Sequence, residues 1–263
     1  MNETENRLNL QSQVIYGPVK SRRLGKSLGL NLSPKEIKLC SLNCSYCQYS
    51  WTGLLVRDAK PFINLLPSVD EVINEFKEKL KGILDNNQEV NFITFSGNGE
   101  PTLHPDFLKI VEAIIKIRDK FLKDAKIACL SNSTTLGNKD VLKAMKMIDE
   151  PIMKFDTAIK ETFLKLNRPS VKIEFEEIKN NLKKLDGKMT IQTLFIEGSV
   201  DNTSNEELRS YINSLRSLKP RLVQIYSLDR LPADKNLIKV SKQKLNEIKK
   251  KIEMEVNLKV VVY

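Results

Sequence analysis

Short apolar runs alternate along this chain with longer segments in which apolar residues recur every three or four positions. Most of the short runs are continuously apolar rather than alternating, which is typical of strands buried on both faces. The predicted strands cover residues 27–32, 90–97, 126–132, 152–158, 190–198 and 222–229, with a possible last strand at 259–263.

The segments between these strands predict amphipathic helices. A capping box of Ser68 and Glu71 begins one of them, and Ser204 with Glu207 begins another in the same way. Pro105 suits the first turn of a third helix. Further helices are expected over 139–148, 159–166, 174–185 and 241–254.

Six successive β-then-α units favour a parallel sheet with helices packed outside it. Periodicity does not separate a doubly wound sheet from an open barrel. However, polar residues follow the carboxyl ends of several predicted strands, and barrels build their active sites in that way. We therefore predict an α/β fold, a single-domain partial (β/α)6 TIM-like barrel with the active site at the C-terminal ends of the strands. Residues 1–26 would form a lead-in, 27–230 the barrel core, and 231–263 a final helix and strand.

Composition and charge narrow the function only a little. A chain of 263 residues that is 41% apolar can bury a core of this size. The net charge of +10 is compatible with RNA or another anionic partner, although the lysines are spread over helix faces such as 242–251. His104 is the one histidine, so histidine-based catalytic triads and multi-histidine metal sites are nearly excluded.

The sequence shows neither a secretory signal nor a membrane-length apolar run, so we expect a cytoplasmic protein with reduced thiols.

Three of the four cysteines are clustered. Cys40, Cys44 and Cys47 have the spacing C-x3-C-x2-C just after the first predicted strand. Electron carriers hold a 4Fe–4S cluster with four cysteines, so three would leave one iron open to a substrate or cofactor. A zinc site would need a fourth ligand, for which only Cys129 and His104 are available. Because Cys129 lies in the middle of an apolar strand, we expect it to be an inert core residue.

These residues carry a resemblance to a known family. The stretch from Cys40 to Cys47, with Tyr46 before the last cysteine, resembles the signature of the radical S-adenosylmethionine (radical SAM) superfamily. The sequence SGNGEP at 96–101 is similar to the glycine-rich element of the same family. Three further stretches resemble one orthologous group of this superfamily, labelled wyosine or tRNA(Phe) imidazoG37 synthetase-like. These stretches are 16–32, 167–170 and 224–230. True wyosine synthases carry a second three-cysteine site, whereas here only Cys129 remains.

The resemblance implies both cofactors and the reaction. A 4Fe–4S cluster on the three cysteines would cleave S-adenosylmethionine reductively into methionine and a 5′-deoxyadenosyl radical, which abstracts hydrogen from a substrate. The substrate is unknown; RNA or a nucleotide-like molecule is slightly favoured by Arg22 and Arg23 in the basic loop from Ser21 to Lys26. A reducing partner such as flavodoxin or ferredoxin is implied. The alternatives are a peptide- or protein-modifying activase and, from another class, a non-enzymatic iron–sulfur or zinc binding module.

The resemblance also places S-adenosylmethionine on particular residues. Tyr46 would lie near the adenine, the backbone at Gly97 and Gly99 would approach the ligand closely, and Glu100 would pair with the methionine amino group. The remaining cofactor-binding candidates at strand ends are Asn98, Ser131, Asn132, Asp156 and Gln192, with Thr193 also expected to face inward. Turn formation or helix capping is the alternative explanation for these polar side chains.

Overall fold

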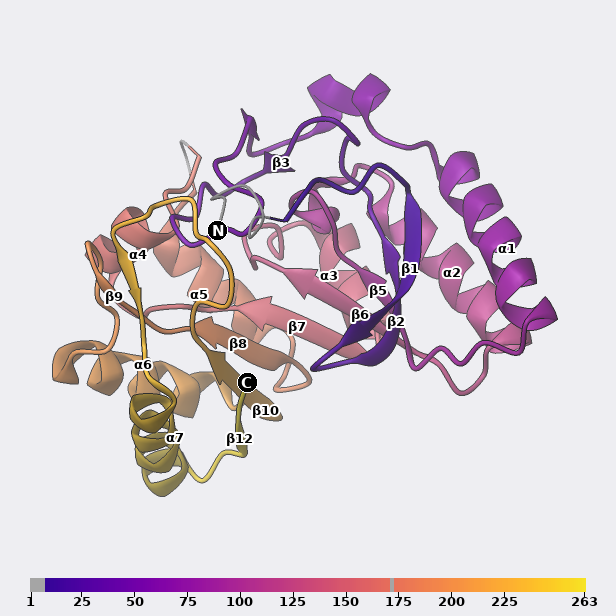
Figure 1. Cartoon of the computed structure of the whole chain (residues 1–263). Helices are drawn as coiled ribbons and strands as arrows, with labels where there is room; N and C mark the ends of the chain where they lie inside the picture. The colour runs from indigo at the N-terminus through magenta and orange to yellow at the C-terminus, as the bar shows by residue number, and fades with distance from the viewer. Residues whose placement is uncertain (1–7, 171–172) are drawn as a thin grey trace, which may run out of the picture.

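A mixed sheet lies at the centre of the molecule, with the strand order β1–β2–β5–β6–β7–β8–β10–β12 (Figure 1). This computed structural model describes residues 8–170 and 173–263. All neighbouring strands of the sheet are parallel except β1 and β2, which form an antiparallel hairpin. The strands are β1 (Ile15–Ser21), β2 (Gly25–Leu30), β5 (Phe92–Phe95), β6 (Lys126–Ser131), β7 (Glu150–Lys154), β8 (Thr190–Leu194), β10 (Leu222–Tyr226) and β12 (Val260–Val262).

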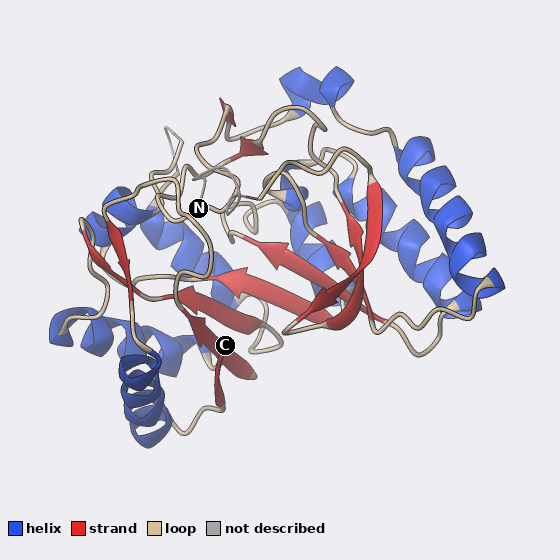
Figure 2. Ribbon diagram, in the orientation of Figure 1, coloured by secondary structure: helices blue, strands red, loops and turns tan. Residues whose placement is uncertain are grey.

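Helices connect most of these strands and contribute to one large core (Figure 2). Four begin with the side chain of their N-cap residue accepting a backbone N–H, among them the two expected at Ser68 and Ser204. The helices are α1 (Val69–Asp85), α2 (Phe107–Phe121), α3 (Lys139–Met147), α4 (Lys160–Leu166), α5 (Phe175–Lys183), α6 (Asn205–Leu218) and α7 (Lys242–Val256), with the 3₁₀ turns η2 (Lys60–Leu65) and η3 (Pro101–Leu103).

The two faces of the sheet differ in what they contact. Side chains such as Ile93 and Ile191 pack with residues of the helices in the large core. Their neighbours along the strands point to the opposite face. There Phe92, Ala128 and Ile152 pack with one another and with Leu24 from the β1–β2 turn, in a small cluster to which none of the described helices contributes. Polar groups can therefore occupy the rest of that face.

Two small two-stranded sheets lie outside the main one. In the first, β3 (Leu39–Cys40) pairs in parallel with β4 (Leu54–Leu55). In the second, β11 (Leu237–Lys239) pairs antiparallel with β9 (Ile196–Gly198). The predicted strand 190–198 is therefore divided in two. Its second part leaves the main sheet, and Asn202 accepts the backbone N–H of Ile196 there.

The other predicted strands and helices are present, with small shifts at their ends. The sequence pattern missed β1, because Gly17 and Pro18 interrupt it and its last two residues, Lys20 and Ser21, are polar. Proline is tolerated there because β1 is an edge strand, and its pairing with β2 is irregular between Tyr16 and Val19. The α/β fold with a parallel-strand sheet is confirmed. The strand order does not show how far the sheet curves, so the partial barrel stays a prediction. No helix in the described parts of the chain is long and apolar enough to cross a bilayer.

Candidate functional site

The loop that carries the three cysteines is tied to several strand ends. Its first cysteine, Cys40, ends β3, and the carbonyl of Leu39 accepts the backbone N–H of Glu100 at 3.1 Å. Further along, the backbone N–H of Ser45 donates to the carbonyl of Leu166, at the end of α4, at 2.9 Å. The loop therefore lies against segments that follow β5 and β7, and its three thiols are free and partly buried.

The glycines after β5 are required by packing within the chain itself. A Cβ on Gly99 would lie 1.7 Å from the carbonyl oxygen of Leu39, and one on Gly97 would lie 2.4 Å from the side-chain oxygen of Asn31. Between them, fully buried Asn98 donates to the carbonyls of Gln11 and Pro34 at 2.8 and 2.9 Å. This segment thus holds β3 close to β5, and the Asn98 amide donates its hydrogen bonds to the loops that contain Gln11 and Pro34.

Glu100 links the loop after β5 to the end of β6. Its carboxylate accepts the backbone N–H of Asn132 at 2.6 Å and the Thr102 hydroxyl at 2.5 Å. Burial raises the pKa of Glu100, and the hydrogen bonds from Thr102, Asn132 and Ser131 oppose that rise without cancelling it. Glu100, Ser131 and Asn132 are therefore brought together beside Cys40, as the sequence predicts.

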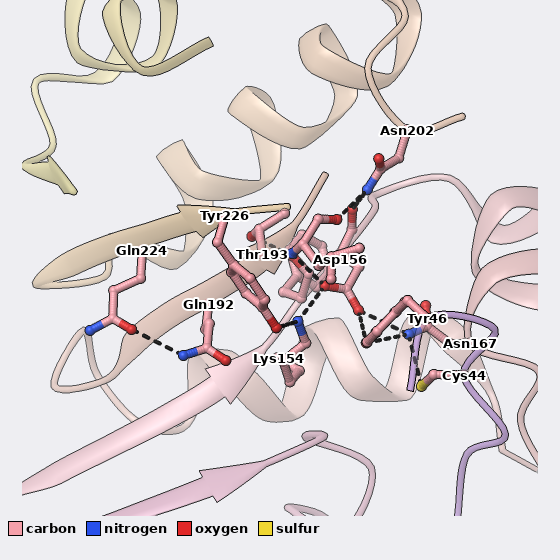
Figure 3. Close-up of polar contacts among 12 residues, drawn as sticks. Cys44, Tyr46, Lys154, Asp156, Asn167, Gln192, Thr193, Asn202, Gln224 and Tyr226 are labelled. Carbon is pink, nitrogen blue, oxygen red and sulfur yellow. Dashed lines mark hydrogen bonds and ion pairs between the residues drawn. The ribbon is translucent and has the colours of Figure 1, made fainter. Parts of the chain in front are cut away.

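Two asparagine amides point at two of the cysteine sulfurs. Nδ2 of Asn132 lies 3.5 Å from Sγ of Cys40, and Nδ2 of Asn167 lies 3.5 Å from Sγ of Cys44 (Figure 3 shows the second contact). Sequence reasoning named Asn132 and included Asn167 only within the stretch 167–170. No periodic signal marks a polar residue that follows a short helix.

Asp156 is the centre of a buried polar network two residues after β7 (Figure 3). Its carboxylate accepts the Tyr46 hydroxyl at 2.5 Å, the Asn167 amide at 2.9 Å and the backbone N–H of Leu194 at 2.9 Å. The ammonium of Lys154 completes the set at 2.7 Å. Tyr46 and Asp156, both predicted site residues, therefore meet directly beside Cys44.

Lys154 is charged in this network. Burial disfavours its ammonium form, but Asp156 and the hydroxyl of Tyr226 outweigh burial, and the pKa of Lys154 is raised. Burial raises the pKa of Tyr46 well above its ordinary value, and the Asp156 charge adds to the effect. The phenol therefore stays protonated and is the donor in its hydrogen bond to Asp156. Lys154 was missed by the sequence analysis, although a lysine at the end of a buried apolar strand was a usable signal.

A row of polar side chains crosses the sheet away from the helices. Lys154, Gln192 and Gln224 are paired in register on β7, β8 and β10, and the Gln192 amide donates to Gln224 at 3.0 Å. Gln192 therefore lies on the sheet face without helices, which would be the interior of the predicted barrel. Thr193 was also expected to face that interior, but it lies on the other face of the sheet, because successive strand residues face opposite sides. Thr193 instead contacts the hydroxyl of Tyr211 on α6.

The basic side chains of the loop from Ser21 to Lys26 contact acidic groups and an aromatic ring. Arg22 pairs with Asp229 at 2.8 Å, and Lys26 pairs with Glu89 at 3.0 Å. The Arg23 guanidinium lies 4.2 Å from the ring centroid of Tyr226. The tip of the β1–β2 hairpin thus reaches across to the end of β10.

The thiols of Cys40 and Cys44 lie in a low-dielectric environment. Burial raises the pKa of Cys40 to about 12, against the opposing charge of Lys38, and raises that of Cys44 to about 11. A metal deprotonates its thiol ligands outright. Positive charge and N–H donors near these sulfurs would then stabilise thiolates, and Lys38, Asn132 and Asn167 supply both.

Neither Cys129 nor His104 completes a tetrahedral metal site. Cys129 is fully buried in the core, as expected, and His104 contacts the carbonyl of Pro67 at 2.9 Å. Among residues 8–170 and 173–263, no three or more His, Cys, Asp and Glu side chains converge so that they could hold one metal ion. A cubane cluster has a different requirement, since each cysteine binds its own iron.

Comparison with known proteins identifies the family. The model of the radical SAM superfamily matches residues 37–225. A protein named GTPase Obg from Brachyspira hyodysenteriae is 28% identical over 266 residues, which cover all of this chain and 37% of that protein. A UPF0026 protein from Synechocystis is 31% identical over 222 residues, covering 83% of this chain and 76% of the relative. The chain thus spans little more than a third of the first relative.

Solved structures share the fold at low sequence identity. A radical SAM methyltransferase from Sphaerobacter thermophilus has a TM-score of 0.64 and 12% identity, over 90% of this chain and 65% of that structure. TYW1 with a lysine–pyruvate adduct bound has a TM-score of 0.63 and 16% identity, over 89% and 75%. At such low sequence identity, the similarity to these two structures shows a shared fold and nothing more.

Proposed function

Because this chain belongs to the radical SAM superfamily, whose members are enzymes, we propose that it is an enzyme of the same type. The superfamily typically uses a 4Fe–4S cluster and S-adenosylmethionine. Cys40, Cys44 and Cys47 would hold one such cluster, leaving one iron for S-adenosylmethionine. The observation that carries this proposal is the three-cysteine loop, which is fastened to the ends of β5 and β7 with amide donors at two of its sulfurs.

The donor set fits a cluster better than a zinc ion. Three thiols on one loop match the cysteine ligands of iron–sulfur clusters. A structural zinc would need four convergent ligands, and the described residues contain no such group. The alternative of a non-enzymatic binding module would explain the cysteines alone. It would leave the polar network of Asp156 and Lys154 without a purpose beyond packing.

When bound, the cluster would supply one electron that breaks the bond between the sulfonium and C5′ of S-adenosylmethionine, giving methionine and a 5′-deoxyadenosyl radical that takes hydrogen from the substrate. The chain's own residues would bind and orient the ligand. The candidates for these contacts are Tyr46, the backbone from Gly97 to Gly99, Glu100, Ser131, Asn132, Asp156 and Gln192. Glu100 and Asp156 already accept hydrogen bonds from the chain, so they would also fix the positions of their neighbours.

We also infer that the sheet forms the predicted partial (β/α)6 barrel. Its support is the β1–β2 hairpin, whose tip contacts the far side of the sheet through Arg22 with Asp229 and through Arg23 with Tyr226. The face without helices would then be the interior, and the row of Lys154, Gln192 and Gln224 would line it. A substrate with hydrogen-bonding groups fits such a lining.

For the substrate and partners we propose a tRNA or nucleotide-like molecule and a reducing protein such as flavodoxin or ferredoxin, in the cytoplasm. The net charge of +10 supports an anionic substrate. The basic loop supports it less than the sequence suggested, because Arg22 and Lys26 are paired with carboxylates. A peptide- or protein-modifying activase is the alternative.

The test is anaerobic reconstitution followed by iron and sulfide analysis, S-adenosylmethionine binding, and assay of 5′-deoxyadenosine after reduction with dithionite. We expect one cluster per chain and slow cleavage without substrate. Cys47→Ala should abolish both, whereas Cys129→Ala, the matched control, should keep both. Stoichiometric zinc without labile sulfide would overturn the proposal. A full cluster with neither cofactor binding nor cleavage would favour the binding module.

A further inference from the structure

We propose that the side-chain amides of Asn132 and Asn167 donate hydrogen bonds to the cluster thiolates of Cys40 and Cys44 and thereby raise the reduction potential of the cluster. This inference rests on the proposed function, since it requires a cluster on those cysteines. It assigns the two asparagines a positioning and tuning role through the sulfurs, separate from any contact with S-adenosylmethionine.

Three hydrogen bonds, to Glu100 and Thr134, hold Asn132 in place. Its backbone N–H donates to Glu100 at 2.6 Å, and its side-chain oxygen accepts the backbone N–H and the hydroxyl of Thr134 at 3.1 and 2.8 Å. The side-chain nitrogen is left to donate, and its acceptors are Ser41 Oγ at 2.8 Å and Cys40 Sγ at 3.5 Å. The direction of this donor is therefore fixed by the chain itself.

The Asn167 amide is oriented by charge. Its nitrogen lies 2.9 Å from the Asp156 carboxylate and 3.5 Å from Cys44 Sγ, and the residue is 3% exposed. Rotating the amide by half a turn would place its oxygen against the carboxylate, where two acceptors repel. The Asp156 charge thus keeps the N–H group beside the sulfur. The amide oxygen is buried and has no partner.

Such donors favour the reduced cluster. Reduction adds an electron to an already negative group, and an N–H donor stabilises the state with more charge on its sulfur ligands. The stabilisation by each hydrogen bond is larger in a buried site, where the dielectric constant is low and water does not replace the donor. Among the described residues, no side-chain amide contacts Cys47, and its backbone N–H donates to the Cys44 carbonyl. Two of the three cysteines are therefore tuned in this way.

Three variants at Asn132 and Ser41 separate the donor from the local structure. Asn132→Asp keeps the acceptor for Thr134 and removes the donor, while Asn132→Leu removes both without adding charge. Ser41→Ala is the matched control, because it deletes the other acceptor of the same amide and leaves the sulfur contact. Asn167→Leu tests the second donor. Because the two asparagines donate to different cysteines, the effects of Asn132→Leu and Asn167→Leu should add.

The measurement is a redox titration of the anaerobically reconstituted full chain without S-adenosylmethionine, followed by electron paramagnetic resonance and normalised to iron and sulfide content. At a fixed solution potential, Asn132→Leu should lower the reduced-to-oxidised ratio roughly tenfold, a shift of about 59 mV for a one-electron couple. Asn132→Asp should lower it further, and Ser41→Ala should leave it within about twofold.

Each contrary result has a distinct meaning. Fully loaded variants with the wild-type potential would overturn the tuning role and leave the proposed function intact. Folded asparagine variants that fail to take up any cluster would show that the amides serve assembly, which also overturns it. A wild-type chain that takes up no cluster would overturn the proposed function and this inference together.

Discussion

The hydroxyl of Tyr46 donates a 2.5 Å hydrogen bond to the carboxylate of Asp156, which joins the cysteine loop to the segment after β7. The two residues are 110 positions apart in the sequence. The same carboxylate contacts Lys154 and Asn167, so one buried charge organises the side of the site that contains Cys44. Changes at Asp156 should therefore affect stability and cluster uptake together.

We predict that Asp156→Asn lowers the free energy of unfolding by about 3–5 kcal/mol, because it leaves the Lys154 ammonium buried without its counter-charge. The side chains of Lys154 and Asp156 are 16% and 1% exposed. Urea denaturation of the metal-free protein gives the measurement. Glu112→Gln is the matched control, since its pair with Lys143 is exposed and should contribute less than about 1 kcal/mol.

A double variant sharpens this test. In Lys154→Met with Asp156→Asn, no unpaired charge remains in the network, so the loss should be smaller than the sum of the two single losses. Strict additivity, or a loss below about 1 kcal/mol for Asp156→Asn, would contradict the view that this ion pair is a coupled buried unit.

Gly99 should tolerate no side chain. Gly99→Ala would place a Cβ 1.7 Å from the Leu39 carbonyl and push β3, with Cys40, away from β5. We expect a loss of roughly 1–3 kcal/mol and reduced iron uptake. Gly82→Ala is the control, because its Cβ would meet nothing within 4 Å on helix α1, and it should gain about 0.5–1 kcal/mol. Equal effects of the two substitutions in urea denaturation would contradict this reading of Gly99.

Much of the fold could be predicted from local pattern. Continuous apolar runs such as 126–132 indicated strands buried on both sides, and N-caps such as Ser204 located helix starts to within a residue. The edge strand β1 could not be predicted in this way. It is only partly buried, and its pairing with β2 contains an irregularity beside Pro18.

The site was predictable where function leaves a local motif. The cysteine spacing and the SGNGEP turn are contiguous stretches, so sequence alone located them. Lys154 and Asn167 contact Tyr46 and Cys44, which are more than a hundred residues away in the sequence. A lysine ending an apolar strand marks Lys154 as unusual but does not reveal its partners, and no local pattern marks Asn167. Gly97 and Gly99 were expected to let the backbone approach a ligand closely, which stays a prediction; within the chain, the atoms that approach these glycines belong to Asn31 and Leu39.

Cys129 should be dispensable for the cluster. It is fully buried on β6 in the main core, and burial raises its pKa well above the ordinary value, so the thiol stays neutral. We expect Cys129→Ala to keep wild-type iron and sulfide while losing roughly 1–2 kcal/mol of stability through a small cavity. Cys44→Ala, measured beside it, should lose the cluster. Loss of iron in Cys129→Ala would show that this thiol takes part in the metal site.

The last prediction uses His104, the one histidine, which is buried in its neutral form. Its Nε2 donates to the carbonyl of Pro67, and its Nδ1 accepts the backbone N–H of Asp106. Burial lowers the pKa of His104 below the ordinary value of 6.5, against the smaller effects of Pro67 and Asp106. Below pH 6.5 the unfolded chain therefore binds a proton that the folded chain does not. The stability that this difference contributes is complete above pH 6.5 and is lost as the pH falls toward the pKa of the folded state.

His104→Gln isolates this contribution, because every other titrating group is common to the variant and the wild type. The difference between their free energies of unfolding, measured in urea from pH 7.5 to about 5, should narrow as the pH falls. Buried Glu100, whose pKa is raised, titrates with the opposite sign in both proteins and cancels in the comparison. The single imidazole also gives one resolvable proton resonance in nuclear magnetic resonance spectra, which should titrate below pH 6.5. An imidazole that titrates above pH 6.5 would mean that folding stabilises the charged form of His104. A difference in stability that does not change with pH would mean that folding leaves the pKa of His104 unshifted. Either result would contradict the burial of a neutral imidazole between Pro67 and Asp106.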